Sequence, residues 1–375
     1  KLHVENILSF SRYRNANEQQ STYSDSIKIE VIDENRSSVR DYSFRTNWKY
    51  SAFEFWKVEV GGQASYLLYE PSYIFNSLSK TPSSRQLSHS METALFIDNK
   101  ITISPWLKLQ PSVRISGYDN GDLNFTSVEP RINCTISFSP EQSINLNYMK
   151  VSQTSHLVFT QALIIKKEIW LPATSFIPPQ LSTQFSAGWN GSFFNGTMNA
   201  EANVYYKKMD NLTSLKEGYE NMFGITGIEN KIENNGVGVA YGTEFSLSKN
   251  TGKWTGSASY CWSYASRQFT NINKGKTYEY DFNRPHSINL TINHEFSKAW
   301  IMSLIWIFQS GIPYTPALGK QFSIDQQTEK FTSVEFIYGE KNSGRMEPYH
   351  RMDIGLVHNT KTKRGNRATW TYSIY

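Results

Sequence analysis

The sequence predicts an all-β protein, an antiparallel transmembrane β-barrel, and two observations carry that prediction. Apolar and polar residues alternate with a period of two along most of the chain, and the long loops gather at one end of the strands. In 288–293, for example, three aliphatic residues alternate with Asn, Thr and Asn, and the same pattern fills 58–68 and 254–264. No stretch combines a period of 3.6 with helix caps, so long helices are not expected.

The alternation divides the chain into about sixteen strands, many of them about twice as long as the strands of ordinary globular proteins. A period of two places successive side chains on opposite faces of a sheet, so one face is apolar and the other is rich in Asn, Thr, Ser and Gln. The expected strands are 3–13, 22–32, 39–50, 54–67, 86–98, 101–117, 126–138, 142–153, 182–194, 197–209, 237–248, 253–265, 284–297, 299–310, 350–360 and 367–375.

The connections between these strands alternate in length. Short turns are expected after the odd-numbered strands, at 98–100, 139–141, 195–196, 249–252 and 297–298. Long loops follow many of the even-numbered strands, at 68–85, 154–181, 210–236, 266–283 and 311–349. Outer-membrane barrels have short periplasmic turns and long extracellular loops, whereas a soluble sandwich has no reason to place every long loop at one end.

Composition excludes several classes of protein. The 375 residues carry 38 Lys and Arg against 33 Asp and Glu, and 14% of them are aromatic. So much aromatic surface excludes a disordered chain, and two cysteines exclude a disulfide-rich scaffold. The small, interleaved net charge of +5 gives no electrostatic reason to bind nucleic acid. The uncharged run 299–319 is broken by Gly311, Pro313 and Pro316, which leaves too few residues for a transmembrane helix.

The sequence contains none of three common catalytic and metal-binding motifs. H-E-x-x-H, G-x-S-x-G and C-x-x-C do not occur. His286 and Ser287 are adjacent on an expected strand, so they face opposite sides and cannot form a nucleophile–base pair. Cys134 lies on an apolar phase and Cys261 on a polar phase, so a disulfide between them is not expected. We therefore expect no enzyme activity, no cofactor and no metal site.

A family resemblance rests on a series of short segments that occur in order between residues 129 and 375. Together they resemble the barrel of TonB-dependent outer-membrane receptors, in the branch that includes SusC-like nutrient importers. The segments are 129–131 (EPR), 148–156 (YMKVSQTSH), 170–172 (WLP) with Pro178 and Pro179, 202–212 (ANVYYKKMDNL), 236–244 (GVGVAYGTE), 249–254 (KNTGKW), 260–269 (YCWSYASRQF), 273–275 (NKG), 283–286 (NRPH), 310–313 (SGIP), 342–353 (NSGRMEPYHRMD) and 370–375 (WTYSIY).

This resemblance implies a 22-stranded barrel, of which about 16 strands are present. It also implies an N-terminal plug domain and a TonB-binding segment, neither of which is recognisable in the sequence. We therefore expect residues 1–375 to be one transmembrane β-barrel domain that is incomplete at both ends. The chain also begins at Lys1 without an initiator Met or a signal peptide.

The resemblance further implies a non-enzymatic transporter in the bacterial outer membrane. Such a transporter imports a nutrient, such as a glycan, a peptide, a siderophore or a cobalamin. The implied partners are the TonB complex, the nutrient itself, outer-membrane lipid and a possible surface lipoprotein. Two alternatives stay open from the residues alone. One is a passive 16-stranded porin, and the other is a soluble or surface-attached carbohydrate-binding β protein.

Candidate substrate contacts are aromatic and Arg side chains on the long loops or at the outer strand ends. Such groups can stack on a sugar ring or hold an anion. For any single one of them, however, packing of one loop against another is the favoured interpretation. The candidates are Trp170, Tyr219, Phe223, Arg267, Phe269, Tyr278, Tyr280, Tyr314, Tyr338 and Arg345.

Overall fold

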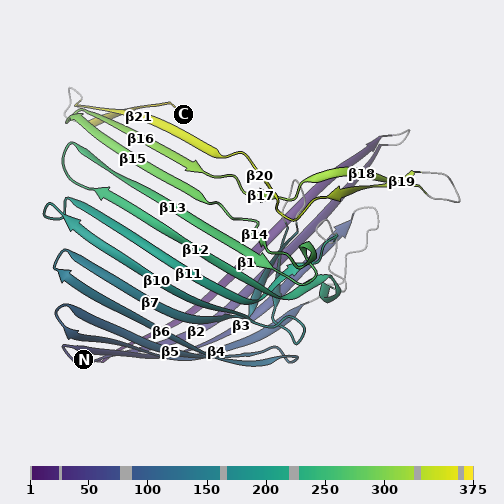
Figure 1. The fold of residues 1–375 in the computed structure, drawn as a ribbon, viewed down its shortest axis with the longest axis horizontal. Coiled ribbons are helices and arrows are strands. Elements are labelled where there is room, and N and C mark those ends of the chain that lie inside the picture. The colour runs from purple at the N-terminus through teal and green to yellow at the C-terminus, as the bar shows by residue number, and fades with distance from the viewer. Residues whose placement is uncertain are drawn as a thin grey trace.

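The computed structural model describes residues 2–24, 28–76, 87–160, 167–218, 228–324, 331–361 and 367–374. Fifteen long or medium strands follow one another in a single antiparallel path, and the short strand β14 joins it at β13 to complete a 16-stranded sheet. The sheet curls so that β1 to β3 pass behind β12 and β13 (Figure 1). The predicted all-β antiparallel class is confirmed. Among the described residues no helix is long and apolar enough to cross a bilayer.

The strands of the main path are joined almost entirely to their sequence neighbours. Their bounds are β1 Leu2–Ser24, β2 Lys28–Phe53, β3 Trp56–Asn76, β4 Ser88–Ser104, β5 Leu107–Asp119, β6 Asn124–Ser139, β7 Gln142–Gln153, β10 Gln180–Phe193, β11 Met198–Leu215, β12 Ile232–Lys249, β13 Trp254–Gln268, β15 His286–Ser297, β16 Trp300–Gln309, β21 Tyr349–Lys361 and β22 Arg367–Ile374. Within the described part of the chain, β1 pairs only with β2 and β22 pairs only with β21.

The remaining elements lie in the long connections at one end of the strands, on the right in Figure 1. They are β8 Ser155–Thr160 with β9 Lys167–Pro172, β14 Tyr278–Glu279, β17 Pro313–Tyr314 with β20 Gly344–Arg345, β18 Ala317–Ile324 with β19 Phe331–Tyr338, and the 3-10 turns η1 Ile228–Lys231 and η2 Asn273–Gly275. The β18–β19 hairpin projects beyond the sheet (Figure 1). In the part of the chain that the structure describes, the connections at the opposite end are short, as the sequence predicts.

Two of the expected boundaries are wrong. The strands expected at 22–32 and 39–50 lie within the long β1–β2 hairpin, because β2 runs unbroken from Lys28 to Phe53. Residues 33–38 contain no Pro or Gly, and a single register shift against β3 between Arg36 and Ser38 accommodates them. The turn expected at 98–100 lies inside β4, which continues to Ser104. The chain reverses instead at 105–106, where Pro105 cannot donate to a ladder.

The two faces of the sheet differ in chemistry, as the period of two predicts. On the inner, or lumen, face polar side chains bond across strands: Thr135 donates to Asn145 at 2.7 Å, and Ser303 donates to Asn293 at 2.7 Å. On the outer face, large apolar side chains such as Leu95 and Phe245 are exposed. A sheet that exposes apolar residues on one face and polar residues on the other fits a wall between lipid and a polar interior.

Aromatic rings border the apolar face at both ends. At the end with long loops, five rings lie in one row across β7 to β13: Tyr148, Phe185, Tyr206, Tyr241 and Tyr264. At the end with short turns, exposed rings recur from strand to strand, namely Phe53, Trp56, Trp106, Phe138, Phe194, Trp254, Phe296 and Trp300. These two belts match the interfacial girdles of membrane barrels.

The distance between the belts agrees with the thickness of a membrane. On β13 ten residues separate Trp254 from Tyr264, which is about 34 Å along an antiparallel strand. With the 35–45° strand tilt of such barrels this becomes about 24–28 Å, close to the ~25 Å apolar band of outer-membrane proteins.

A pair of arginine substitutions on β12 tests which face meets lipid. Phe245 lies on the outer face and Ser246 on the lumen face, halfway between the two belts. Phe245→Arg is expected to lower the free energy of unfolding in lipid vesicles by about 2–4 kcal/mol, because a charge at the bilayer midplane is poorly solvated. Ser246→Arg is the matched control and should change it little. Equal losses in a denaturant titration would contradict the assignment.

Candidate functional site

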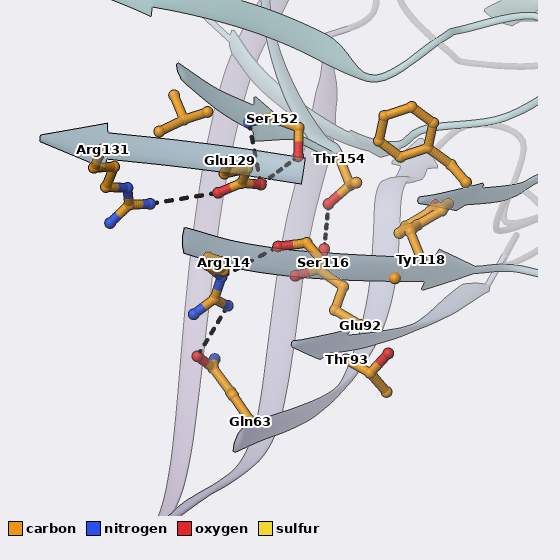
Figure 2. A pocket seen from close by; sticks show the side chains of 13 residues that line it. Gln63, Glu92, Thr93, Arg114, Ser116, Tyr118, Glu129, Arg131, Ser152 and Thr154 are labelled. Atoms are coloured by element: carbon orange, nitrogen blue, oxygen red, sulfur yellow. Dashed lines mark hydrogen bonds and ion pairs between the residues drawn. The ribbon is translucent and has the colours of Figure 1, made fainter. Parts of the chain in front are cut away.

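A cavity of about 280 Å³ opens on the lumen face of β3 to β7, and we call it the lumen cavity. The small side chains of Ala94 and Ser116, opposite each other on β4 and β5, leave room for it. The polar and charged side chains that line it are Gln63, Glu92, Thr93, Arg114, Ser116, Tyr118, Glu129, Arg131, Ser152 and Thr154 (Figure 2).

Glu129 is held in place by neighbours on both sides. Its carboxylate accepts bonds from the Ser152 backbone N–H at 3.3 Å and the Ser152 hydroxyl at 2.7 Å. It also pairs with Arg131 at 3.4 Å. The Glu129 side chain is only 5% exposed, so these bonds replace the water that a buried carboxylate would otherwise need. Glu129 therefore fixes the wall around the cavity and has little capacity left for a ligand.

Arg114 and Glu92 keep bonding capacity that faces the cavity. Arg114 donates through Nε to Ser116 Oγ at 3.2 Å and through Nη2 to Gln63 Oε1 at 3.2 Å. A guanidinium has five N–H donors, so three remain. Glu92 accepts a bond from Thr154 through one oxygen, and among the described residues it forms no ion pair with Arg114. The cavity can therefore bind a polar or charged solute through hydrogen bonds.

A second cavity, of about 240 Å³, lies on the lumen face of β11 to β15. Glu201, Asn203, Glu244 and Asn289 line it with Cys261, whose position on the polar face is as predicted. Cys261 and Cys134 are both free thiols. In the part of the chain that the structure describes, no three His, Cys, Asp or Glu side chains are grouped to hold a metal ion.

The β8–β9 hairpin connects separate parts of the wall at the mouth of the lumen. Ser155 at its base bonds to Tyr69 of β3 at 2.6 Å, and Trp170 of β9 packs edge-on against Tyr13 of β1 at 6.0 Å. Phe159 makes an edge-to-face contact at 5.1 Å with Phe282, in the loop after β14. A small apolar core fixes the hairpin, made of Val158, Ile169, Leu171, Ile177, Leu215 and Ile232.

His156 sits in this hairpin and is fully buried. Gln180 Nε2 lies 3.0 Å from His156 Nδ1 and donates to it, which places the proton of the neutral ring on Nε2. That Nε2 has no partner among the described residues. Burial away from water lowers the pKa of His156 to about 4, because the charged ring would lose its hydration.

The structure brings five of the expected substrate contacts together at the mouth, around β13, β14 and β20. Phe269 and Tyr278 are buried in a small core with Leu212 and Ile272, so they pack loop against loop. Burial also raises the pKa of the Tyr278 phenol. The Arg267 guanidinium stacks over the Tyr280 ring at 3.9 Å.

Arg345 ties the loops of this cluster together. It donates to the backbone oxygens of Gly311 at 2.7 Å and Asn283 at 3.2 Å, and it forms an ion pair with Glu279. Its contacts are therefore those of a structural crosslink between the loops that follow β13 and β16.

The other expected contacts are dispersed. Trp170 packs on Tyr13, and Tyr338 is exposed on β19. Tyr314 is exposed on β17 and lies opposite Gly344, beside Arg345 of the cluster. Tyr219 and Phe223 lie outside the described residues. The residues of the lumen cavity were not among the expected contacts. The sequence feature that could have identified them is a charged residue at a polar position of the alternation, as at Glu92 and Arg114.

A curled antiparallel sheet with an apolar outer face, aromatic belts and a polar lumen defines a transmembrane barrel. The family described as "TonB dependent receptor-like, beta-barrel" matches residues 3–372, and the chain belongs to this family. It is therefore a barrel of the bacterial outer membrane, as predicted. No curated protein sequence matches the chain.

Several solved receptors share the fold at low sequence identity. The ferric-catecholate import receptor Fiu from E. coli K12 has a TM-score of 0.61 at 10% identity, over 95% of this chain and 55% of Fiu. The copper transporter OprC gives 0.60 at 9%, over 95% and 53%. The ferripyoverdine receptor of Pseudomonas aeruginosa gives 0.57 at 13%, over 94% and 48%. The chain spans about half the length of these receptors.

The burial of His156 predicts a pH-dependent hairpin. Its pKa of about 4 lies below the ordinary 6.5, so the opened hairpin binds more protons than the closed one between these values. The stability contributed by the neutral ring is complete above about pH 6.5 and is lost as the pH falls towards 4. After correction for intrinsic rates, amides in 154–180 should exchange about 10-fold faster or more at pH 5 than at pH 7.

The controls for this experiment are within the chain. His156→Gln should remove the pH dependence, whereas His3→Gln, at an exposed position, should retain it. Amides of β12 and β13 should show no comparable change. A pH dependence that survives in His156→Gln would show that another group controls the hairpin.

Proposed function

We propose that this chain forms the wall and the mouth loops of a transporter that imports a polar nutrient across the outer membrane with energy from the TonB complex. The observation that carries the proposal is the lumen cavity, where Arg114 and Glu92 offer unfilled hydrogen-bonding groups to the interior. The family supports the transport class, because TonB-dependent receptors are transporters and not enzymes. The β8–β9 hairpin supports an entrance of restricted width.

The nutrient is proposed to carry hydrogen-bonding or charged groups, because the residues that line both cavities are predominantly polar. Fiu is described as a ferric-catecholate import receptor and OprC as a copper transporter, and these substrates are those of Fiu and OprC. For this chain the proposal is limited to a polar nutrient, and it does not choose among a glycan, a peptide, a siderophore and a cobalamin. The SusC-like branch and the surface lipoprotein partner stay predictions.

We further propose that β1 and β22 each pair with another strand, so that the sheet closes into a barrel. Among the described residues, β1 and β22 each pair on one side. Backbone groups left unpaired in lipid cost several kcal/mol each, so an open edge within the membrane is unstable. Further strands that pair with β1 and β22 would close the wall, as the expected 22-stranded barrel requires.

Growth and uptake measurements test this function. A strain without the gene is compared with wild type on a panel of sole nutrients, each with and without TonB. We expect one nutrient to require both the gene and TonB. For that nutrient Arg114→Gln is expected to lower uptake about 10-fold, because hydrogen bonds to charged groups contribute about 1.5–3 kcal/mol.

Lys208→Gln serves as the control for this experiment, because Lys208 lies on the outer face and pairs with Asp210 at 3.4 Å. Its uptake should equal that of the wild type. Gene-dependent uptake that is unaffected by loss of TonB would contradict energy coupling and would favour the passive porin.

A further inference from the structure

A group of basic residues lies on the lipid-facing side of β1, β2 and β4, close to the end with long loops. Arg12 of β1 is directly opposite Arg40 of β2, and Leu68 of β3 connects this row to His89 of β4. Arg14 lies two residues further along β1, on the same face. We call Arg12, Arg14, Arg40 and His89 the basic rim.

The direction of the basic rim follows from its neighbours. Tyr13 contacts Trp170 of the β8–β9 hairpin, so it faces the lumen, and Arg12 and Arg14 on either side of it face outwards. Ser90 is fully buried on the lumen side, which places His89 on the outer face. His89 stacks against Tyr66 at 6.1 Å, on that same face.

The height of the basic rim on the wall is set by aromatic residues. Two residues closer to the membrane centre, Phe10, Tyr42 and Tyr66 lie opposite one another on β1, β2 and β3. The Phe10 and Tyr42 rings are 5.0 Å apart, and all three side chains are exposed. Aromatic rings of this kind sit at the level of lipid headgroups. The basic rim is therefore at the outer boundary of the apolar band.

The charges of the basic rim are not neutralised within the described residues. Like charges directly opposite each other on neighbouring strands are destabilising, and Arg12 and Arg40 form such a pair. None of Arg12, Arg14 and Arg40 forms an ion pair in the described part of the chain. Glu70, two residues beyond Leu68 on β3, is 8% exposed and accepts a bond from Ser38 Oγ at 3.2 Å.

We propose that the basic rim binds the phosphate groups of lipid headgroups in the outer leaflet of the outer membrane. Arginine presents several N–H donors that match phosphate oxygens in a bidentate arrangement. A phosphate between Arg12 and Arg40 would convert their repulsion into two charge-assisted contacts. Basic clusters at a membrane boundary attract anionic headgroups in this way. The aromatic rings beneath them hold the wall at the corresponding depth.

Another part of the wall provides a contrast at the same spacing from an outward aromatic residue. Lys208 lies two residues beyond Tyr206 of the outer aromatic row, as Arg40 lies two residues from Tyr42. Lys208, however, pairs with Asp210 at 3.4 Å, so its charge is balanced by the chain itself. It is a matched control for an outward basic residue that does not need a lipid phosphate.

The test uses the purified full-length receptor in detergent and bisphosphorylated lipid A as the probe. Binding is measured by native mass spectrometry for wild type, for the double variant Arg12→Gln/Arg40→Gln, and for Lys208→Gln. The double variant is expected to bind about 10- to 30-fold more weakly. Lys208→Gln is expected to match wild type, and dephosphorylated lipid A is expected to bind wild type as weakly as the double variant binds lipid A.

Three results would overturn the assignment. They are equal binding of the dephosphorylated lipid, full binding by the double variant, and displacement of lipid A by inorganic phosphate at the same concentration. Heat-modifiable migration in gels reports whether the double variant is folded. If it is not, the salt dependence of wild-type binding decides, because a phosphate site must weaken as salt rises. Binding that is independent of salt would refute the proposal.

Discussion

The pairing of backbone N–H and C=O groups is the constraint on which the rest of this structure depends. Hydrocarbon offers no water to these groups, so each strand within the membrane must bond to a neighbour on both sides. The 16-stranded sheet meets this demand along its path with registers that are mostly continuous, such as Tyr206 opposite Tyr241. The long strands and the short turns at one end of the sheet follow from this need to pair every backbone group within the membrane.

Once the backbone is paired, side chains decide which face meets lipid. A strand has a period of two, so a wall between lipid and a polar lumen must alternate apolar and polar residues. That alternation allows charged groups such as Glu129 and Arg114 to lie on the lumen face of the wall, where they bond to lumen neighbours. Among the described residues, outward charges such as Arg12 and Arg40 lie near the boundary, where headgroups can reach them.

The mouth of the barrel is held together by packed loops and not by the alternation of apolar and polar residues, because it lies beyond the apolar band. Its segments build two small cores, one around the β8–β9 hairpin and one around Phe269 and Tyr278. Arg345 joins the loops that follow β13 and β16, and the buried His156 accepts a bond from Gln180 of β10. The entrance is thus defined by packed loops, while the interior is defined by the polar face of the sheet.

The part of the fold that could be predicted from the sequence is the part governed by the period of two. Strand class, lumen orientation of Cys261 and the one-sided long loops all follow from alternation. The break expected between 32 and 39 was wrong, because outside the membrane a strand can continue without apolar alternation. Packing of Phe269 and Tyr278 between loops was one of the two interpretations, but their partners were not predictable, since loop contacts join residues that are distant in sequence and carry no periodic signal.

The lumen cavity, too, could be predicted from the sequence only in part. Charged residues on the polar phase were visible in the sequence, but the cavity needs Gln63, Glu92 and Arg114 from three different strands. Their proximity depends on the registers of β3, β4 and β5, and one strand alone does not reveal a register.

The most direct test of the central claim is a spin-label scan along 242–248 of β12 in membranes, with Cys134 and Cys261 replaced by Ser. The wall between lipid and lumen predicts that collision with oxygen, which concentrates in lipid, peaks at Thr243, Phe245 and Leu247. Collision with a water-soluble nickel chelate should peak at Glu244 and Ser246. Equal nickel accessibility at all positions, with no period of two, would contradict it.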